Sequence, residues 1–406
     1  MAINLELPRK LHTTIDQARD AALQIFRPIS RKYDLAEHAY PVELDTLASL
    51  YNGLAAAGQA GAGASGGRGD ANKERPEGYN ANGGNMQSVL NAMWASYGDV
   101  GLMLSIPYQG LGNAAIAAVA TDDQIEEMGG EVWAAMAITE PGFGSDSAAV
   151  TTTAIRDGDE YVINGEKIFV TAGSRASHIV VWASADRSLG RAAIKSFVVP
   201  RDHPGVTVAR LEHKLGIKAS DTAVIRFEDC RIPASFLLGS PEVDVKKGFG
   251  GVMQTFDNTR PMVAAMAVGV SLAALEELRK LLEDAGLEID YDRPAADQPA
   301  AVAEFIRMEA DYEAAYLLSI RAAWMADNKM PNSLEASMSK AKAGRTGTDV
   351  TNKAVELAST YGYSERSLLE KWARDSKILD IFEGTQQIQQ LIIARRILGK
   401  SSAELK

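Results

Sequence analysis

The sequence predicts a mainly α-helical protein with a β-domain inserted between two helical parts. Apolar residues recur at helical spacing in the first part of the chain, short segments rich in β-branched residues follow, and long amphipathic segments return after residue 250. We therefore expect a helical N-terminal domain over 1–133, a middle β-barrel-like domain over 134–245 and a C-terminal four-helix bundle over 246–406.

The N-terminal part contains two helical regions with a loop between them. Helical periodicity covers residues 11–57 and returns over residues 86–120. The stretch Gly58–Gly84 is rich in glycine, alanine and asparagine, which favours a long surface loop over regular structure.

The middle part alternates short apolar segments with turn signals. Turns such as Asp157-Gly158-Asp159 and Asn164-Gly165 separate segments that are enriched in β-branched and aromatic residues. The predicted strands are Ala134–Thr139, Val150–Ile155, Tyr161–Val170, His178–Ala183, Ser196–Val199, Val206–Ala209 and Ala223–Phe227.

The C-terminal part reads as long helices joined by short connections. Amphipathic periodicity predicts helices over 251–285, 299–328, 333–360 and 366–398. Their number and length indicate an antiparallel four-helix bundle. The connection at 286–298 is acidic and contains proline, so we expect it to be exposed.

Composition limits the classes of partner. The 406 residues carry a formal net charge of -11, which argues against nucleic acid or an anionic membrane as the main partner. No apolar stretch approaches the ~20 residues that a membrane-spanning helix needs. Cys230 is the single cysteine, so no intramolecular disulfide can form, and the first residues lack a signal-peptide pattern. We expect a cytoplasmic protein.

The sequence lacks the motifs of several common catalytic sites. No Gly-x-Ser-x-Gly elbow, no Gly-x-x-x-x-Gly-Lys-Ser/Thr loop and no glycine cluster within a βαβ unit occurs. No metal is expected either, because the histidines have no ligand partner at helical or zinc-finger spacing. These histidines are His12, His38, His178, His203 and His213.

The stretch Ala135–Asp146 combines an apolar strand with a polar turn. The turn contains two glycines, a proline, a serine and two acids. Small side chains and exposed backbone N–H groups suit a flat polar ring or a phosphate that approaches the chain closely. The alternative is an ordinary corner between a strand and a loop.

Two further positions could carry chemistry. Phe169 and Thr171 pair an aromatic ring with a hydroxyl at a spacing that places both on one strand face, which suits stacking beside a ring and bonding to its edge. A half-buried strand is the commoner alternative. Glu383 follows Ile381-Phe382 and precedes Gly384, which breaks the helix. Partial burial raises the pKa of such a carboxylate and suits it to general-base work. The alternative for Glu383 is a solvated helix cap.

Several motifs in order resemble the acyl-CoA dehydrogenase family. The first is Ala-Ile-Thr-Glu-Pro-Gly-Phe-Gly-Ser-Asp at 137–146, which resembles that family's signature almost position for position. The others are Ser220-Asp221-Thr222 through Phe227–Pro233, Asp257–Pro261, and Arg374–Ile378 running on to Glu383–Gln389. The resemblance covers nearly the whole chain and implies the helix–β–helix fold of the family.

The resemblance implies FAD as the cofactor and assigns residues to it. Thr139 would bond the edge of the flavin pyrimidine, Ser145 would reach N5 and the pyrophosphate side, and Phe169 would shield the ring. The full set implied for the cofactor is Met136, Ile138, Thr139, Gly144, Ser145, Phe169, Thr171, Thr385 and Gln387. The set implied for the acyl-CoA substrate is Ser145, Asp257, Arg260 and Gly384.

The implied activity is α,β-dehydrogenation of an acyl-CoA thioester to the trans-2-enoyl-CoA. Glu383 matches the base that takes the α-proton while a hydride leaves the β-carbon for flavin N5. The electrons would pass to an electron-transfer flavoprotein. Rival functions are an acyl-CoA oxidase and a non-catalytic partner subunit. A flavin monooxygenase is less favoured, because such members generally lack a glutamate at the base position.

Two departures from the family pattern affect residues that reach a neighbouring subunit's FAD. An Arg-x-x-Phe motif is replaced at 287–294, where Arg293 has no aromatic at the right spacing and three acids crowd it. At 358–363, Ser359 and Thr360 stand where the family has paired glycines. We therefore predict a hetero-oligomer like the α2β2 acyl-CoA dehydrogenases of actinobacteria. Neutral drift in a homotetramer is the alternative.

Overall fold

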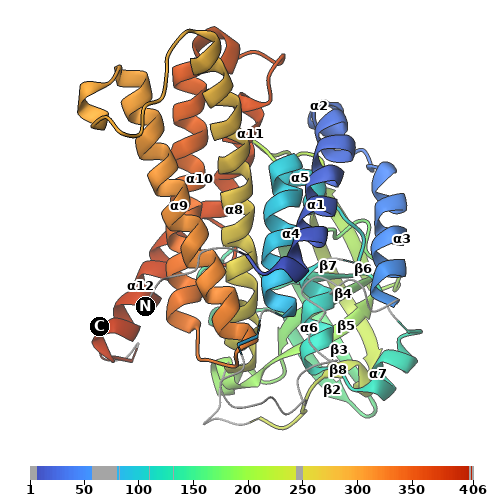
Figure 1. Cartoon of the computed structure of the whole chain (residues 1–406). Coiled ribbons are helices and arrows are strands. Elements are labelled where there is room, and N and C mark those ends of the chain that lie inside the picture. Colours follow the sequence, from blue (N-terminus) through green and yellow to red (C-terminus); the bar gives the residue numbers. More distant parts are fainter. Residues whose placement is uncertain are drawn as a thin grey trace.

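The computed structural model describes residues 7–56, 80–81, 83–108, 110–130, 132–243, 250–401 and 404. Long helices form one part of the molecule, shorter N-terminal helices pack beside them, and a sheet lies against both (Figure 1). Most of the expected Gly58–Gly84 loop falls outside the described residues. The mainly α fold with an inserted β-domain is confirmed.

The N-terminal part is helical, as predicted. A buried glycine marks where it meets the bundle: a Cβ on Gly269 would lie 2.0 Å from the carbonyl oxygen of Met93, so α4 and α8 pack backbone to backbone. The elements are η1 Arg9–Leu11, α1 His12–Ala21, η2 Ala22–Phe26, α2 Arg27–Leu35, α3 Glu43–Ala56, α4 Gly84–Gly98, α5 Val100–Met103, α6 Leu111–Val119 and α7 Asp122–Glu127.

The sheet contains every predicted strand, with shifted ends, and one that the pattern did not show. The missed strand, β8, has only two residues, too few for any periodicity. The strands are β1 Ala134–Ala137, β2 Thr153–Asp157, β3 Glu160–Thr171, β4 His178–Ser184, β5 Ile194–Pro200, β6 Val206–Leu211, β7 Thr222–Pro233 and β8 Leu237–Leu238. η3 Ser147–Ala149, η4 Arg187–Ala193 and η5 Ala234–Phe236 lie between them.

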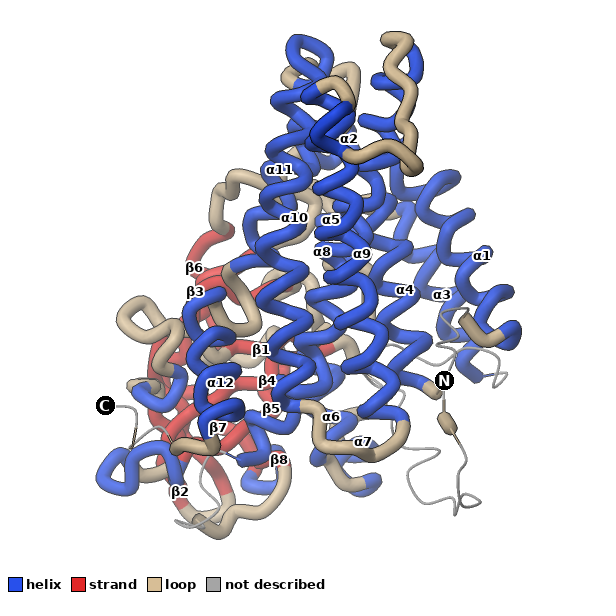
Figure 2. Tube along the Cα trace, turned by 60° about the vertical axis from the view of Figure 1, so that its left-hand side comes forward, coloured by secondary structure: helices blue, strands red, loops and turns tan. Residues whose placement is uncertain are grey.

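The pairing order is β6-β7-β3-β2-β4-β5-β8, and β1 pairs with β4 in parallel. Figure 2 shows the strands gathered on one side of the molecule, with helices making up the rest. The β3–β7 ladder has register shifts between Ile163 and Gly165 and between Lys167 and Val170. The second shift bends β3 beside a predicted flavin position.

The bundle confirms three of the four predicted helices and corrects the fourth. α8 Gly250–Asp284, α9 Ala300–Asp327 and α10 Ser333–Gly362 run side by side, with η6 Ala295–Asp297 before α9 (Figure 1). The segment predicted as one helix over 366–398 is instead divided into α11 Leu369–Ser376, η7 Lys377–Asp380 and α12 Gln386–Leu398. The break coincides with Glu383 and Gly384, whose φ angles are 57° and 92°.

One helix requires a second correction. Thr259–Asp284 of α8 is long and apolar enough to cross a membrane, contrary to the expectation of no such stretch. However, 78% of its most apolar window is buried inside the protein, which is the character of a core helix. It packs with α4 and α9 in the main hydrophobic core, where Val263, Met93 and Phe305 are buried.

A buried ionic network joins the three parts of the chain. Lys371 of α11 donates to Asp99 at 2.6 Å and to Asp375 at 2.5 Å, and Asp99 also accepts from Ser30 of α2. The backbone N–H of Ile217, in the loop before β7, donates to Asp375 at 2.5 Å. Buried charges need such partners, so this network fixes how the N-terminal helices, the sheet and the bundle meet.

Candidate active site

The predicted base lies in the turn between η7 and α12. Thr259 of α8 donates from Oγ1 to Oε2 of Glu383 at 2.8 Å. Burial raises the pKa of Glu383, while the bond from Thr259 and the charges of Arg260 and Lys340 act in the opposite direction. A carboxylate whose pKa is raised, and which accepts a hydrogen bond at one of its two oxygens, is suited to accepting a proton.

The backbone of this turn is held by side chains from two helices. Lys340 of α10 donates to the Gly384 carbonyl at 2.7 Å, and Gln389 of α12 donates to the carbonyls of Glu383 and Gly384 at 2.9 and 3.2 Å. Gly384 has a φ angle of 92°, which favours glycine, and a Cβ there would lie 2.4 Å from Nε2 of Gln389 and displace this donor. Neither Lys340 nor Gln389 was predicted as a site residue.

The other site residues predicted near Glu383 differ in burial and in their contacts. Arg260 is buried next to Thr259, and its charge acts on Glu383. Thr385 caps α12 by accepting from the N–H of Ile388, and Gln387 is exposed. The side chain of Asp257 lies outside the described residues. The hydrogen bonds described for Glu383 and Gly384 go to α8, α10 and α12, not to the sheet.

The structure brings the two predicted flavin segments of the sheet together. The N–H of Ile168 donates to the carbonyl of Thr139 at 2.8 Å, and Lys167 donates to the carbonyl of Ile138 at 3.1 Å. Met136 and Ile138 are half-buried and pack against Trp182 and its neighbours. The end of β1 and the end of β3 therefore form one surface.

A buried ion pair that the sequence did not indicate supports this surface. Glu140 accepts from Lys167 at 2.8 Å and from the backbone and hydroxyl groups of Thr151 and Thr152 at 2.6 to 2.9 Å. Burial alone would raise the pKa of Glu140, but these donors lower it to about 2. Lys167 has a pKa of about 8 because burial lowers it against the pull of Glu140, so the pair is ionised at neutral pH.

Phe169 lies at the bulge of β3 and does not follow regular strand alternation. Its φ angle is 57°, and 60% of the residue is exposed, whereas Val170 beside it is buried. The register shift between Lys167 and Val170 interrupts the regular alternation of β3, so strand spacing alone does not fix the face of Phe169. That Phe169 and Thr171 share one face stays a prediction. A large aromatic in left-handed backbone is strained, and such strain clusters at functional positions.

The turn after β1 leaves space around its glycines. Glu140 and Phe143 exchange backbone hydrogen bonds of 3.1 Å and close a tight turn. A Cβ on Gly142 would meet nothing within 4 Å, and one on Gly144 would only just reach Thr139 at 4.0 Å. Ser145 is exposed in the same turn. Protein packing does not require these glycines, and the open backbone fits a ligand that approaches closely.

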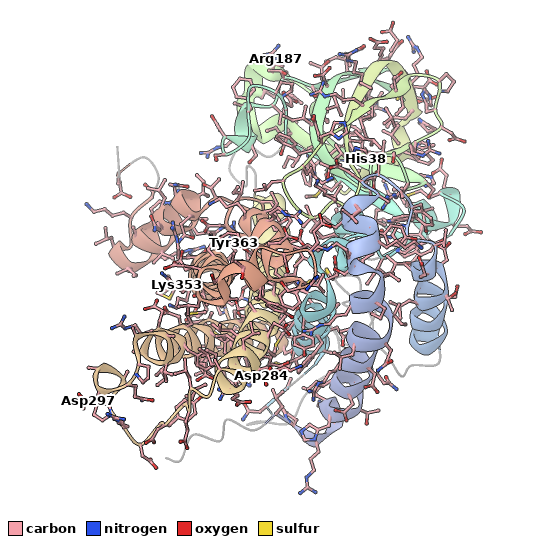
Figure 3. All side chains as sticks on the ribbon, turned by 90° about the horizontal axis from the view of Figure 1, so that it is seen from above. His38, Arg187, Asp284, Asp297, Lys353 and Tyr363 are labelled. Carbon is pink, nitrogen blue, oxygen red and sulfur yellow. The ribbon has the colours of Figure 1, made fainter. Side chains whose placement is uncertain are left out.

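Tertiary contacts bring together two histidines that the chain spacing kept apart. The ligand atoms of Glu37, His38 and His213 lie within 4.8 Å of one another, and Figure 3 shows His38 where the N-terminal helices meet the sheet. His213 donates from Nδ1 to Oε2 of Glu37 at 3.0 Å. Burial lowers the pKa of His38, and the cations Lys214 and Arg175 lower it further. The same positive charges disfavour a bound cation, so this cluster is a poor metal site.

The segment 287–294, where the chain first departs from the family pattern, makes hydrogen bonds with helices of its own chain. Arg279 of α8 donates to the Tyr291 hydroxyl at 2.5 Å and to Glu309 of α9, and Tyr291 also donates to Glu309. Figure 3 places Asp284 and Asp297, at the two ends of this connection, on the side of the bundle away from the sheet. Tyr291 of the segment 287–294 is therefore engaged within its own chain.

At the second departure from the family pattern, Ser359 has a backbone conformation typical of the glycine that the family has there. Ser359 has φ 50° and ψ -131°, a conformation that glycine adopts far more readily than serine. Gly362 is still required, because a Cβ there would lie 2.5 Å from the carbonyl oxygen of Val355. The end of α10 thus keeps a glycine-type turn without the glycine.

Comparison with known proteins agrees with this arrangement. Residues 135–230 match the acyl-CoA dehydrogenase middle domain and residues 246–398 match the acyl-CoA dehydrogenase C-terminal domain. The mitochondrial short-chain specific acyl-CoA dehydrogenase of Bos taurus is 40% identical over 262 residues, which are 64% of this chain and 62% of that relative. The match thus spans less than two thirds of the bovine protein.

Two other proteins are matched over more of their length. YngJ of Bacillus subtilis, described as a probable acyl-CoA dehydrogenase, is 34% identical over 337 residues, 80% of this chain and 85% of YngJ. The structure of butyryl-CoA dehydrogenase from Megasphaera elsdenii is 27% identical and has a TM-score of 0.81, covering 98% of this chain and 100% of that one. By domain matches, by sequence and by fold, this chain belongs to the acyl-CoA dehydrogenase family of flavoproteins.

Proposed function

We propose that the protein catalyses FAD-dependent α,β-dehydrogenation of an acyl-CoA thioester with Glu383 as the base. The observation that carries this proposal is the half-buried Glu383 carboxylate at a helix break, with a raised pKa and a hydrogen bond from Thr259. A carboxylate whose pKa is raised by its surroundings is a candidate for proton transfer.

The residues of the sheet fit FAD as the cofactor. The open backbone at Gly142 and Gly144, the exposed Ser145 and the exposed ring of Phe169 lie around the joined ends of β1 and β3. Thr139, Ile138 and Met136 would hold the flavin edge, as the family resemblance implies. When bound, FAD supplies the group that accepts a hydride.

The chain's own residues would handle the proton. Glu383 takes the α-proton of the thioester, and the raised pKa increases its affinity for that proton. Arg260 and Lys340 oppose the effect of burial on the pKa of Glu383 and so favour the ionised carboxylate that accepts a proton. The bond from Thr259 holds one oxygen, so the carboxylate keeps a fixed orientation.

Replacement of the base tests the proposal directly. We expect Glu383→Gln to lower kcat at least about a thousandfold while the purified protein keeps its flavin absorbance. Glu365→Gln, a change near the end of α10, is the matched control and should retain turnover. Full activity of Glu383→Gln would overturn the base assignment. Peroxide measured in the same assay distinguishes an oxidase from a dehydrogenase that passes electrons to an electron-transfer flavoprotein.

We also propose a heteromeric assembly in which a homologous subunit contributes to the FAD site. Two observations support it: Tyr291, within the departing segment 287–294, is engaged by Arg279 and Glu309 of its own chain, and Ser359 has the backbone conformation typical of glycine. Co-expression with a tagged homologue that keeps the Arg-x-x-Phe motif should yield a complex with more bound FAD per chain. Full FAD occupancy of the isolated chain would contradict the heteromer.

The acyl group is the least constrained part of the proposal. A dye-reduction screen with short, long, branched and steroidal CoA thioesters, with and without the partner, would identify the preferred substrate. The Gly58–Gly84 loop, which we expect near the acyl pocket, lies mostly outside the described residues. The cytoplasmic location remains a prediction.

A further inference from the structure

Lys340 is a fully buried lysine in the middle of α10 with an unusual partner. Its Nζ donates to the carbonyl oxygen of Gly384 at 2.7 Å. In the described part of the chain no carboxylate lies within ion-pair distance of it. Fully buried lysines are rare and costly unless they are paired, so a lysine that bonds only to a backbone carbonyl needs a reason.

The carbonyl that Lys340 holds belongs to a strained turn. Glu383 and Gly384 both have left-handed φ angles, of 57° and 92°. A glutamate in that conformation costs free energy and persists only when surrounding contacts enforce it. Lys340 from α10 and Gln389 from α12 supply such contacts to the carbonyls of the turn.

Lys340 also contributes to the charge balance around the base. The charged groups that act on it are Asp380 of η7, Glu383 of the turn and Arg260 of α8, and Asp380 also lies 3.9 Å from Arg345. Burial lowers the pKa of Lys340 to about 8, with Asp380 and Glu383 opposing this and Arg260 adding to it. The cationic form of Lys340 in turn lowers the pKa of Glu383.

We propose that Lys340 is a positioning residue for the base: its ammonium group holds the Gly384 carbonyl, and this contact fixes the Glu383 turn and places a compensating charge beside the carboxylate. The inference rests on the proposed function for its catalytic meaning. The geometric part, that Lys340 sets the conformation and protonation of Glu383, stands without it.

Two substitutions of Lys340 separate charge from hydrogen bonding. Lys340→Met removes both, and we expect kcat to fall about tenfold to a hundredfold with a smaller change in KM. Because the cation normally lowers the pKa of Glu383, its loss should move the acid limb of the kcat/KM profile about one pH unit upward. Lys340→Arg keeps the charge and should leave that limb near its wild-type position.

A titration that needs no turnover keeps this test independent of the proposed function. In protein labelled with carboxyl-¹³C glutamate, the Glu383 signal is identified by its loss in Glu383→Gln, and its midpoint should rise in Lys340→Met. Lys342→Met, which removes an α10 lysine paired with Asp311, is the control and should change neither readout. A wild-type Glu383 midpoint in Lys340→Met would overturn the positioning role, whereas absent turnover in the wild type would overturn only the enzyme assignment.

Thermal unfolding guards against a merely structural effect. If Lys340→Met and Lys340→Arg lose stability and activity together with an unmoved Glu383 titration, Lys340 is a packing residue and the proposal is wrong. Gln389→Met, which removes the second donor to the turn without changing charge, should lower kcat and leave the Glu383 midpoint close to the wild-type value.

Discussion

The two halves of the site each contain a fully buried lysine, and the two lysines are used differently. In the sheet, Lys167 forms an ion pair with Glu140, whose oxygens are also bonded by Thr151 and Thr152. In the bundle, Lys340 donates to a carbonyl, and the nearby carboxylates act on it only at longer range. The proposed flavin half thus rests on a neutral ion pair with all its oxygens bonded, whereas the proposed base half keeps unbalanced charge close to the carboxylate that we propose changes protonation.

The largest expected loss of stability comes from breaking the ion pair between Lys167 and Glu140. Lys167→Met leaves the Glu140 carboxylate buried without its cation, which typically costs about 3–5 kcal/mol of unfolding free energy. Lys340→Met removes a single hydrogen bond to a carbonyl and should cost about 1–3 kcal/mol. Urea unfolding of both variants measures the difference. Lys195→Met, a sheet lysine that donates to the carbonyls of Ser240 and Glu242, is the control. Equal losses for Lys167 and Lys340 would remove the contrast between the halves.

The same ion pair predicts how stability depends on pH. Glu140 has a pKa of about 2 in the folded protein against an ordinary value of 4.5, so its contribution is complete above about pH 4.5 and is lost as the pH falls toward 2. The shift corresponds to at most about 3 kcal/mol. Urea unfolding at pH 7, 4.5 and 3 should show this loss in the wild type. Glu140→Gln should have a flatter acid limb, and an identical limb in both proteins would contradict the role of Glu140.

A substitution at Ser359, at the end of α10, should change stability less and in the opposite direction. Ser359→Gly should stabilise the protein by about 1 kcal/mol, because glycine adopts φ 50° and ψ -131° without the clash that serine meets. Differential scanning calorimetry measures the gain. Ser364→Gly, a change at a half-buried residue beyond α10, is the matched control and should not stabilise. No gain for Ser359→Gly would mean that contacts of the serine compensate for its backbone.

The sequence predicted elements well where periodicity reports burial and failed where tertiary contacts override it. The strands and the three long bundle helices follow the apolar pattern closely. The break before α12 was indicated only by Gly384. The left-handed turn at Glu383 was missed because Ile378, Ile381 and Phe382 continue an apolar pattern that gives no sign of it.

Within the candidate site, the signature motifs indicated Glu383 and the two flavin segments. The residues that support them were not predicted, because their partners are far apart in the chain. Lys340 contacts Gly384 only after α10 packs beside α12, and Lys167 meets Glu140 across two strands. A buried lysine in a predicted helix or strand is the one signal that could have drawn attention to them.

The smallest expected effect concerns the strained aromatic in the sheet. Phe169→Gly relieves the left-handed backbone, but glycine also loses more conformational freedom on folding, so we expect a net stability change within about 0.5 kcal/mol. Flavin retention should nevertheless fall, measured as FAD per chain after gel filtration, because 60% of Phe169 is exposed and its ring packs little against its own chain. Phe236→Leu, elsewhere in the sheet region, serves as the control and should keep its flavin. A variant with wild-type flavin content would show that the strain at Phe169 belongs to the bulge alone. In that case Phe169 and Ser359 would be equivalent, two residues in glycine-type backbone with no role in the site.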